Sequence, residues 1–297
     1  MRLSIPTFSP LIVSKIFKIP YVVERNDSVA LIKSIGFSSK LWITLAKLIE
    51  RVNFTHATRI IAVTQGLKYE IRELYNIPDE RIVVIENGAN TDLFKPMSKE
   101  KCIKELNLDE SQHYVCFVGN LAPWQGVEYL IEAVPLILKK IPNTNFLIVG
   151  DGMMKEKLVK LAKKTGISDK IIFTGAVPYE KVPKYINASD VCVAPFIKER
   201  KLKIGLSPLK IYEYLSCEKP VVSTQIPNLE FIERENAGIL VEPENPKELA
   251  KAIVTLLNNR KLRKEMGENG RKYVVKKHSW KIVAKRVAEV CEEVIAT

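Results

Sequence analysis

A predicted helix that opens at Ser207-Pro208 carries the groups best suited to binding an anion. Proline is favoured in the first turn of a helix, and the unpaired amides of that turn, at Leu209 and Lys210, could donate hydrogen bonds to a phosphate. The Lys210 ammonium would add a point charge. Glu213 follows one turn later, where its carboxylate could accept hydrogen bonds from a ligand or simply face solvent.

Two glycine-containing turns follow predicted strands in the same half of the chain. Gly119 would allow a tight strand-to-helix turn with amides free to hold a diphosphate, although a purely structural turn would have the same sequence. Gly150-Asp-Gly152 is similar to the start of a dinucleotide-binding fingerprint, but Lys155 occupies the third glycine position and the turn does not follow the domain's first strand. An NAD-dependent oxidoreductase is therefore disfavoured.

A charged run at 198–203 precedes the helix that carries Lys210. In a doubly wound sheet this loop faces the ligand crevice, so Arg200, Lys201 or Lys203 could contact a diphosphate. Most charge runs in proteins are solvated surface, however, and both interpretations of this run stay open.

The elements that must position these residues alternate between short strands and helices. Apolar, β-rich stretches are followed by amphipathic helical patterns, which is typical of parallel βαβ units. The predicted strands cover 114–118, 145–149, 171–173, 191–194, 220–223 and 238–241, and helices lie near 155–165, 179–187, 208–216, 228–233 and 246–257. These units predict one doubly wound Rossmann-like domain of the α/β class, with its ligand at the carboxyl ends of the strands.

Fewer strands are predicted in the first part of the chain. They lie near 21–23, 59–63 and 81–85, with helices near 39–53 and 66–75. Asn87-Gly88 marks a turn after the third strand. We therefore expect three parts: a partial N-terminal domain over 1–108, a C-terminal domain over 109–278, and a final helix over 279–297 that returns to the first domain.

Composition narrows the class of ligand. The formal charge of +12 indicates an acidic partner, unless it serves solubility alone. No basic stretch is interleaved with aromatics, so nucleic acid is not expected, which leaves a phosphate ligand or an anionic membrane surface. The 5 cysteines and 3 histidines lack the spacing of redox or metal sites, so no metal or cofactor is expected. Apolar runs far shorter than the ~20 residues that span a bilayer, and no secretory signal, predict a cytoplasmic protein.

Ordered motifs along the chain resemble the large family 4 of retaining GT-B glycosyltransferases. They lie at 59–66, 77–96, 117–127, 148–152, 173–178 and 207–222. The resemblance implies two facing Rossmann-like domains, of which the second holds most of the donor. It also implies metal-independent transfer of a sugar, with retention, from a UDP- or GDP-linked nucleotide sugar to a hydroxyl of a glycan, lipid-linked or small acceptor.

The resemblance also implies roles for individual residues. Glu213 matches the glutamate that accepts hydrogen bonds from the donor ribose. We expect Asn26, Asp27 and Lys210 to be catalytic, and Asn87 and Gly88 to lie at the hinge beside the cleft. The full set of expected donor contacts is Gly119, Asn120, Gln125, Gly150, Val177, Pro178, Lys203, Ser207, Leu209, Lys210 and Glu213.

The sequence departs from the family pattern at the positions that handle charge. Asn120 and Gln125 replace an arginine and a lysine that neutralise the leaving diphosphate. Without the arginine and the lysine, stabilisation of the leaving diphosphate would be weaker by roughly several kcal/mol unless other cations replace them. Lys210 and the run at 198–203 are the natural substitutes. Gly205 stands where a second glutamate would contact the donor sugar, which resembles a recurring variant of this loop.

A further departure concerns proton transfer. Asn26 and Asp27 occupy the neighbourhood of a histidine that approaches the transferred sugar in many members. Either side chain could hydrogen-bond a sugar hydroxyl, but neither replaces a histidine in proton transfer at neutral pH without a shifted pKa.

The predicted N-terminal domain is shorter than that of the family, because 20 residues precede the strand near 21–23. We expect the first family strands to be missing, which would leave this strand as an unpaired edge open to a partner chain. The alternative function is therefore a nucleotide-sugar-binding fragment or subunit that a separate N-terminal chain completes. The basic surface also favours a peripheral visit to the inner membrane surface and its lipid-linked acceptors.

Overall fold

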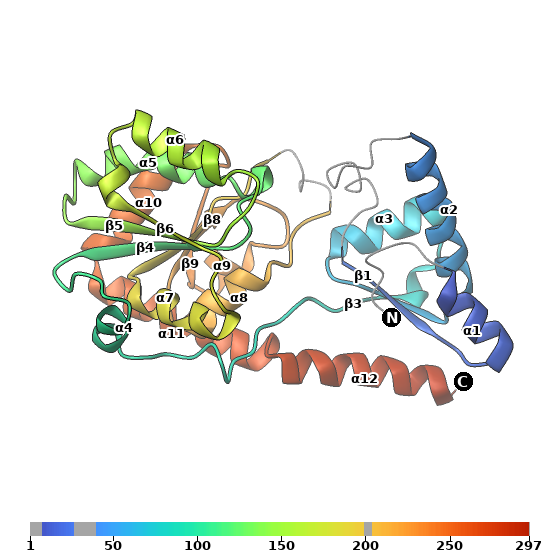
Figure 1. Cartoon of the computed structure of the whole chain (residues 1–297). Helices are drawn as coiled ribbons and strands as arrows, with labels where there is room; N and C mark the ends of the chain where they lie inside the picture. The colour runs from blue at the N-terminus through green and yellow to red at the C-terminus, as the bar shows by residue number, and fades with distance from the viewer. Residues whose placement is uncertain (1–7, 27–39, 199–203, 297) are drawn as a thin grey trace. The chain divides into compact units, whose positions relative to one another are not determined.

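The chain divides into two compact units (Figure 1). The computed structural model describes residues 8–26, 40–198 and 204–296. The smaller unit contains the chain up to Asn87, a short stretch that ends at Ser207, and the chain from Lys281 onwards. The larger unit contains Gly88–Leu202 and Pro208–Trp280.

The division after Asn87 differs from the boundary that we expected near 108. The segment between these positions includes helix α4 (Lys99–Glu105), which packs against α7 (Val182–Ala188) of the larger unit. Asn187 of α7 fixes the segment, because its Oδ1 accepts a hydrogen bond from the amide of Met97 at 2.9 Å. Residues 88–108 therefore lie with the larger unit.

The smaller unit is built on a parallel sheet. Its described strands follow the order β1 (Val22–Arg25), β2 (Arg59–Ala62) and β3 (Ile82–Val84). Its helices are α1 (Ser9–Phe17), α2 (Lys40–His56), α3 (Gln65–Tyr75) and most of α12 (Trp280–Ala296). Successive residues of a strand point to opposite faces, so Ile60 packs with Phe54 and Leu67, whereas Ile61 packs with Val283 of α12. Helices therefore cover both faces of this sheet.

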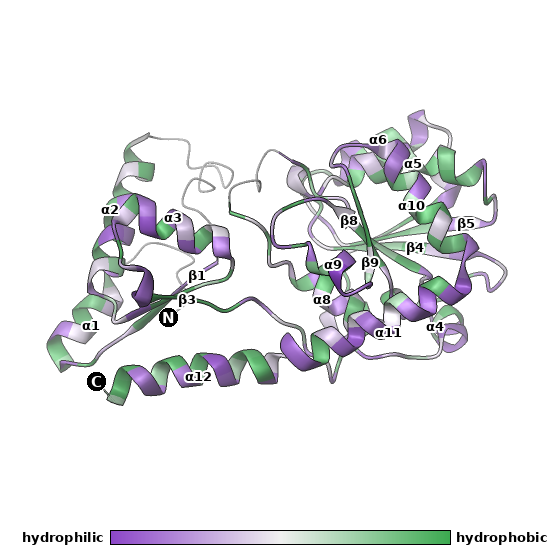
Figure 2. Ribbon diagram, turned by 180° about the vertical axis from the view of Figure 1, so that it is seen from behind, coloured by the Kyte–Doolittle hydropathy of each residue, from purple (hydrophilic) through white to green (hydrophobic). Residues whose placement is uncertain are grey.

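The larger unit contains a parallel sheet of six strands in the order β6-β5-β4-β7-β8-β9. The strands are β4 (His113–Val118), β5 (Thr144–Val149), β6 (Ile171–Gly175), β7 (Val191–Ala194), β8 (Val221–Thr224) and β9 (Gly238–Val241). This is the doubly wound Rossmann order, and it confirms the predicted fold class. Figure 2 shows β4 and β5 coloured as hydrophobic, as expected for strands covered on both faces.

Helices cover both faces of this second sheet (Figure 1). One face carries α5 (Val127–Leu138), α6 (Lys155–Lys164) and α10 (Pro246–Asn258). The other carries α4, α7, α8 (Leu209–Ser216), α9 (Phe231–Arg234) and α11 (Arg260–Lys277). Short 3-10 turns are η2 (Asp79–Arg81), η3 (Pro123–Gln125), η4 (Ser168–Lys170) and η5 (Tyr179–Lys181).

Helix α11 was not among the helices predicted from the sequence. Asn259 caps it by accepting a hydrogen bond from the Leu262 amide at 3.0 Å. Two internal glycines lower the helical propensity of the segment. Both are needed for close packing on α8 and the turn after it, because a Cβ at Gly267 would lie 2.1 Å from the Glu218 carbonyl oxygen and one at Gly270 2.5 Å from a Leu215 methyl group.

Helix α1 was also not predicted, and it exposes much of its apolar surface. Ile12, Val13, Ile16 and Phe17 are all exposed, and Lys15 is exposed beside them. Within the described ranges, no helix is both long enough and apolar enough to cross a membrane.

Candidate functional site

The candidate site lies at the carboxyl ends of the strands in the larger unit. The chain order of the sheet reverses between β4 and β7, and ligands of doubly wound sheets bind at this switch point. The loop after β4 begins at Gly119, and the loop after β7 leads to α8. Helix α8 contributes Lys210 and Glu213, whose spacing of three residues places them on one face of the helix.

Neutral groups hold the Lys210 ammonium at the end of β4. Its Nζ donates a hydrogen bond to Gln125 Oε1 at 2.7 Å and lies 4.0 Å from the centre of the Phe117 ring. A Cβ atom at Gly119 would lie 2.5 Å from Nζ, so the ammonium rests against this glycine. Burial lowers the pKa of Lys210 to about 7, although the charge of Glu213 opposes the shift. No carboxylate of the described residues forms an ion pair with this ammonium.

The first turn of α8 adds backbone donors beside this ammonium. Pro208 is the N-cap, and no side chain caps the helix. The described residues provide no hydrogen-bond acceptor for the amides of Leu209 and Lys210. Free amides, the positive end of the helix dipole and an uncompensated ammonium together form a site for an anion.

Glu213 is 7% exposed and has one hydrogen-bonding partner among the described side chains. The Tyr179 hydroxyl donates to Glu213 Oε1 at 2.9 Å, and the Tyr179 ring lies against Phe94 with the ring centres 5.2 Å apart. Burial raises the pKa of Glu213, while the Tyr179 hydrogen bond and the Lys210 charge oppose this effect. Glu213 therefore presents a desolvated carboxylate with its second oxygen available to hydroxyl donors.

The expected role of Gly119 needs a correction. Its amide is not free, because it donates to the Val149 carbonyl at 2.9 Å, and the Leu121 amide donates to Asp151 O at 2.8 Å. Close packing requires glycine at the neighbouring turn, because a Cβ at Gly150 would lie 2.0 Å from the Gly119 carbonyl oxygen. Both glycines have positive φ, 144° and 137°. They bring the ends of β4 and β5 together, and the first turn of α8 provides free amides.

Other expected donor contacts surround this centre. Asn120 is exposed, and its Oδ1 would lie 2.3 Å from a Cβ at Gly152, so it packs on the turn after β5. Val177 and Pro178 lead into η5, with Pro178 as its N-cap, and η5 presents Tyr179 to Glu213. The two residues thus position a side chain that contacts the Glu213 carboxylate.

Asn87 and Ser207 are joined within the smaller unit. The Asn87 amide donates to Ser207 Oγ at 2.8 Å, and Asn87 Nδ2 donates to the Ser207 carbonyl at 2.9 Å. The chain leaves this unit directly after each residue, at Gly88 and at Pro208. The hinge that we predicted at Asn87-Gly88 is therefore tied to a second connection between the units.

The predicted catalytic residues outside α8 are only partly described. Asn26 follows β1, and its Nδ2 donates to Glu24 Oε1 at 2.7 Å. Asp27, Arg200, Lys201 and Lys203 lie outside the described residues. Roles for Asn26 and Asp27 stay predictions. Within the described part of the chain, no cluster of His, Cys, Asp and Glu side chains is arranged to hold a metal ion.

Sequence reasoning missed the aromatic residues of the site. Tyr179 directly follows the motif at 173–178, where the sequence predicts only a helix, and Phe117 falls within a predicted strand. A tyrosine beside a polar turn is a weak signal by itself, because its hydrogen-bonding partner lies 34 residues away in the sequence.

Two family descriptions match the chain. The family described as "Glycosyl transferases group 1" matches residues 98–273. The family described as "Glycosyltransferase Family 4" matches residues 4–93. The first match contains the site residues from Phe117 to Glu213, whereas Phe94 lies outside it.

Individual relatives agree with these matches. An uncharacterized glycosyltransferase of Methanocaldococcus jannaschii is 30% identical over 283 residues, which cover 93% of this chain and 70% of that protein. Sucrose-phosphate synthase from Thermosynechococcus elongatus aligns with a TM-score of 0.80 and 22% identity, covering 97% of this chain and 71% of that one. The Anabaena protein HepE in complex with UDP aligns with a TM-score of 0.78 and 21% identity, covering 96% and 75%.

Proposed function

We propose a donor and a reaction for this chain from the premise that it belongs to the glycosyl transferases of group 1, family 4. Membership makes it a glycosyltransferase, and its fold is that of the GT-B structures. The proposed donor is a nucleotide diphosphate sugar, linked to UDP or GDP. The proposed reaction transfers the sugar to an acceptor hydroxyl, with retention of the anomeric configuration and without a metal ion. The UDP held by HepE supports this class of donor.

The contact between Lys210 and Gln125 carries the proposal. Position 125 is where the family places a lysine that neutralises the leaving diphosphate. Here the ammonium of Lys210 reaches the end of the Gln125 side chain, at 2.7 Å, from α8. The cation is therefore supplied at the same place by a different residue. As the bond between the anomeric carbon and the diphosphate oxygen breaks, the electron pair leaves with the diphosphate, and the ammonium and the α8 amides stabilise the charge.

Glu213 fits the donor ribose. Tyr179 occupies Oε1, and Oε2 has no hydrogen-bond donor among the described residues. Two adjacent ribose hydroxyls can donate to this carboxylate, which burial has already removed from water. The spacing of Lys210 and Glu213 on α8 matches a ligand whose anion and sugar hydroxyls are neighbours, as they are in a nucleoside diphosphate.

Retention requires the acceptor hydroxyl to bond to the anomeric carbon on the face that the diphosphate leaves. The acceptor oxygen supplies the new bond, and its proton passes to an oxygen of the departing diphosphate. This route needs no histidine. It therefore agrees with the presence of Asn26 and Asp27 in the region where many family members carry a histidine. We assign these two residues to hydroxyls of the transferred sugar.

Donor turnover tests the proposal. The purified chain is incubated with UDP- and GDP-sugars, nucleoside diphosphate release is measured, and the anomeric configuration of the product is determined by NMR. We expect slow donor hydrolysis, faster release with a suitable acceptor, and a retained anomer. Donor binding without hydrolysis or transfer would contradict the enzyme proposal for the isolated chain and favour a nucleotide-sugar-binding subunit that a separate chain completes.

Helix α1 supports an acceptor at an anionic membrane surface. Ile16 and Phe17 are 66% and 65% exposed, and Lys15 and Lys18 can contact lipid phosphates beside them. We expect the chain to sediment with phosphatidylglycerol vesicles at low salt and less at high salt. Replacing Ile16 and Phe17 with serine should abolish sedimentation. Equal sedimentation of this variant would assign binding to net charge alone.

A further inference from the structure

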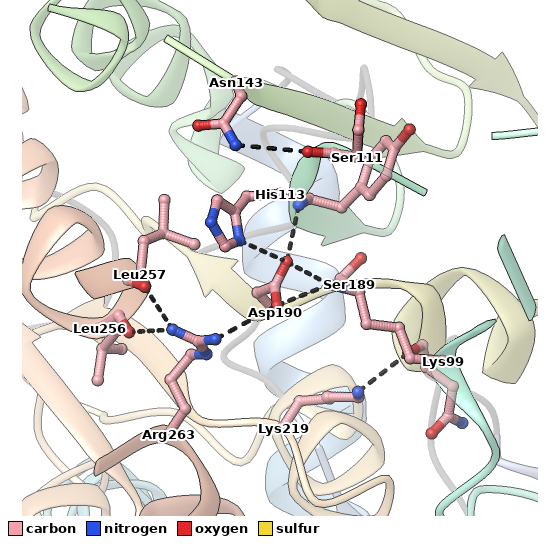
Figure 3. A network of polar contacts seen from close by, with 12 residues as sticks. Lys99, Ser111, His113, Asn143, Ser189, Asp190, Lys219, Leu256, Leu257 and Arg263 are labelled. Carbon is pink, nitrogen blue, oxygen red and sulfur yellow. Dashed lines mark hydrogen bonds and ion pairs between the residues drawn. The ribbon is translucent and has the colours of Figure 1, made fainter. Parts of the chain in front are cut away.

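A second cluster of charged side chains lies at the other end of the same sheet, where the strands begin. Asp190 precedes β7, Lys219 precedes β8 and His113 begins β4, so all three lie at the amino ends of strands. Arg263 of α11 and Lys99 of α4 approach from the side (Figure 3). A cavity of about 250 Å³ opens between these elements.

Asp190 is already fully compensated. Its carboxylate oxygens each lie 2.7 Å from Lys99 Nζ, and the Tyr114 amide donates to Oδ2 at 3.0 Å. Arg263 Nη2 and His113 Nδ1 lie 3.6 and 3.4 Å from the same carboxylate. Burial would raise the pKa of Asp190, but these contacts hold it well below its usual range. One carboxylate thus serves several cationic or donating groups.

The remaining cations of the cavity have no comparable partner. The Lys219 ammonium donates to the Asn187 carbonyl at 3.0 Å, and no carboxylate of the described chain forms an ion pair with it. Arg260 also has no ion pair within the described ranges, and Lys264 has only Glu268, at 3.8 Å. Burial lowers the pKa of Lys219, which shows that its charge is poorly solvated.

Like charges are therefore crowded around one small space. Arg260 lies close enough to Arg263 to disfavour its charge, and Lys99 has the same effect on Lys219. The cavity is lined by five cationic side chains and two carboxylates. Glu218, the second carboxylate, lies 3.8 Å from Arg271. Positive potential concentrated in a pocket attracts an anion.

We propose that this pocket, between Lys219, Arg260, Arg263 and Lys264, binds a phosphate-type anion. Its volume is smaller than the roughly 300–1,000 Å³ of pockets for drug-sized ligands, so the anion is inorganic phosphate or diphosphate rather than a nucleotide. The anion neutralises Lys219 and Arg260 and links α11 to the strand ends. The site lies at the amino ends of the strands, whereas Lys210 and Glu213 lie at the carboxyl ends. The proposal therefore does not depend on the proposed donor.

Calorimetric titration of the full chain with inorganic diphosphate, at constant ionic strength set with chloride, tests the site. The double variant Arg260→Ala/Lys264→Ala removes two exposed cations of the pocket. The matched control, Lys272→Ala/Lys276→Ala, removes two exposed cations from the same helix outside it. The donor site is intact in all three proteins, so its own binding of diphosphate cancels. We expect the pocket variant to bind about tenfold or more weakly and the control to be unchanged.

A second variant keeps the test independent of folding. Lys219→Met should lose the diphosphate binding of the pocket and keep that of the donor site, while its melting temperature stays equal or rises, because a desolvated charge is removed. Equal losses in the pocket and control variants, or equal binding of chloride, would overturn the proposal. Sedimentation with phosphatidic acid vesicles without any binding of free diphosphate would also overturn it, since a lipid headgroup would then be the ligand.

Discussion

Two cations withdrawn from solvent, Arg25 in the smaller unit and Lys210 in the larger, have opposite surroundings. The Arg25 guanidinium is 1% exposed and lies 3.4 Å from Glu50 Oε2 and 3.0 Å from Glu70 Oε1. The Phe54 ring lies 5.6 Å from it. The Lys210 ammonium has a neutral amide and an aromatic ring instead of carboxylates.

This difference separates a structural charge from a binding charge. A guanidinium paired with two carboxylates has its charge compensated within the protein, and its ion pairs fix the surrounding elements. An ammonium held by neutral groups keeps its attraction for an anion, at the cost of poor solvation. Incomplete compensation is thus a better sign of a binding site than burial of charge alone.

The largest effect is expected at the structural cation. Arg25→Met leaves Glu50 buried without its cation, so the free energy of unfolding should fall by about 3–5 kcal/mol, as measured by denaturant unfolding. Donor affinity of the folded protein should be unchanged. The double variant Arg25→Met/Glu50→Gln should recover part of the stability. A donor affinity that falls with the single variant would contradict the division between structural and binding charges.

Lys210→Met should have the reverse profile. We expect the rate of sugar transfer to fall by about 10²–10³-fold, because the leaving diphosphate loses its cation, with little change in stability. Steady-state kinetics with the natural donor measures this, and Lys272→Met on the surface of α11 is the control. Adding Gln125→Lys to the Lys210→Met variant should restore part of the rate, because the two side chains end at the same place. If the rate of the double variant does not recover, the proposal that Lys210 replaces the family lysine at position 125 is wrong.

Glu213→Gln should weaken donor binding by about 1–3 kcal/mol, because the charged hydrogen bonds to the ribose are lost. Calorimetry with the nucleoside diphosphate measures the change. Glu156→Gln, an exposed glutamate of α6, is the matched control. An unchanged affinity in the Glu213 variant would show that this carboxylate does not bind the ribose.

Donor affinity should also depend on pH. Since burial lowers the pKa of Lys210 to about 7, the ammonium is lost as the pH rises above that value in the donor-free protein. Affinity should therefore fall with rising pH, by up to roughly tenfold per unit. Lys210→Arg keeps its charge and should remove the dependence. The same alkaline loss in the arginine variant would assign the titration to another group.

The smallest effect is expected for Tyr179→Phe. Losing one hydrogen bond to Glu213 should cost about 0.5–1.5 kcal/mol of donor affinity. The Tyr179 hydrogen bond lowers the pKa of Glu213, so its removal should move the acid limb of the pH profile to higher pH. An acid limb that does not move would leave Tyr179 as a packing residue.

Much of the larger unit could be predicted from the sequence. Its strands are apolar runs bounded by glycine or proline, and local patterns of this kind survive folding. Helix α11 was not predicted because Gly267 and Gly270 weaken its helical pattern. The need for these glycines is seen only in their close contacts with α8 and the turn after it. Local propensity cannot reveal a contact between helices that lie apart in the sequence.

The candidate site was also predicted only where its features are local in the sequence. The motif around α8 identified Lys210 and Glu213 because a helix start and a spacing of three are local features. The pairing of Lys210 with Gln125 joins residues 85 positions apart, so the sequence suggested a substitute without giving its contact. The sequence also does not reveal that the Gly119 amide is bonded, because its acceptor, the Val149 carbonyl, lies on the neighbouring strand.

The contact between Gly119 and Gly150 limits how this protein can diverge. Main-chain atoms set the limit, since a methyl group at 150 would meet the carbonyl of 119. Side-chain repacking nearby therefore offers no compensation. In a deep mutational scan position 150 should tolerate no replacement, whereas the exposed Asn120 next to its partner should accept many, so a library meant to alter donor choice gains diversity at 120 and loses every clone changed at 150.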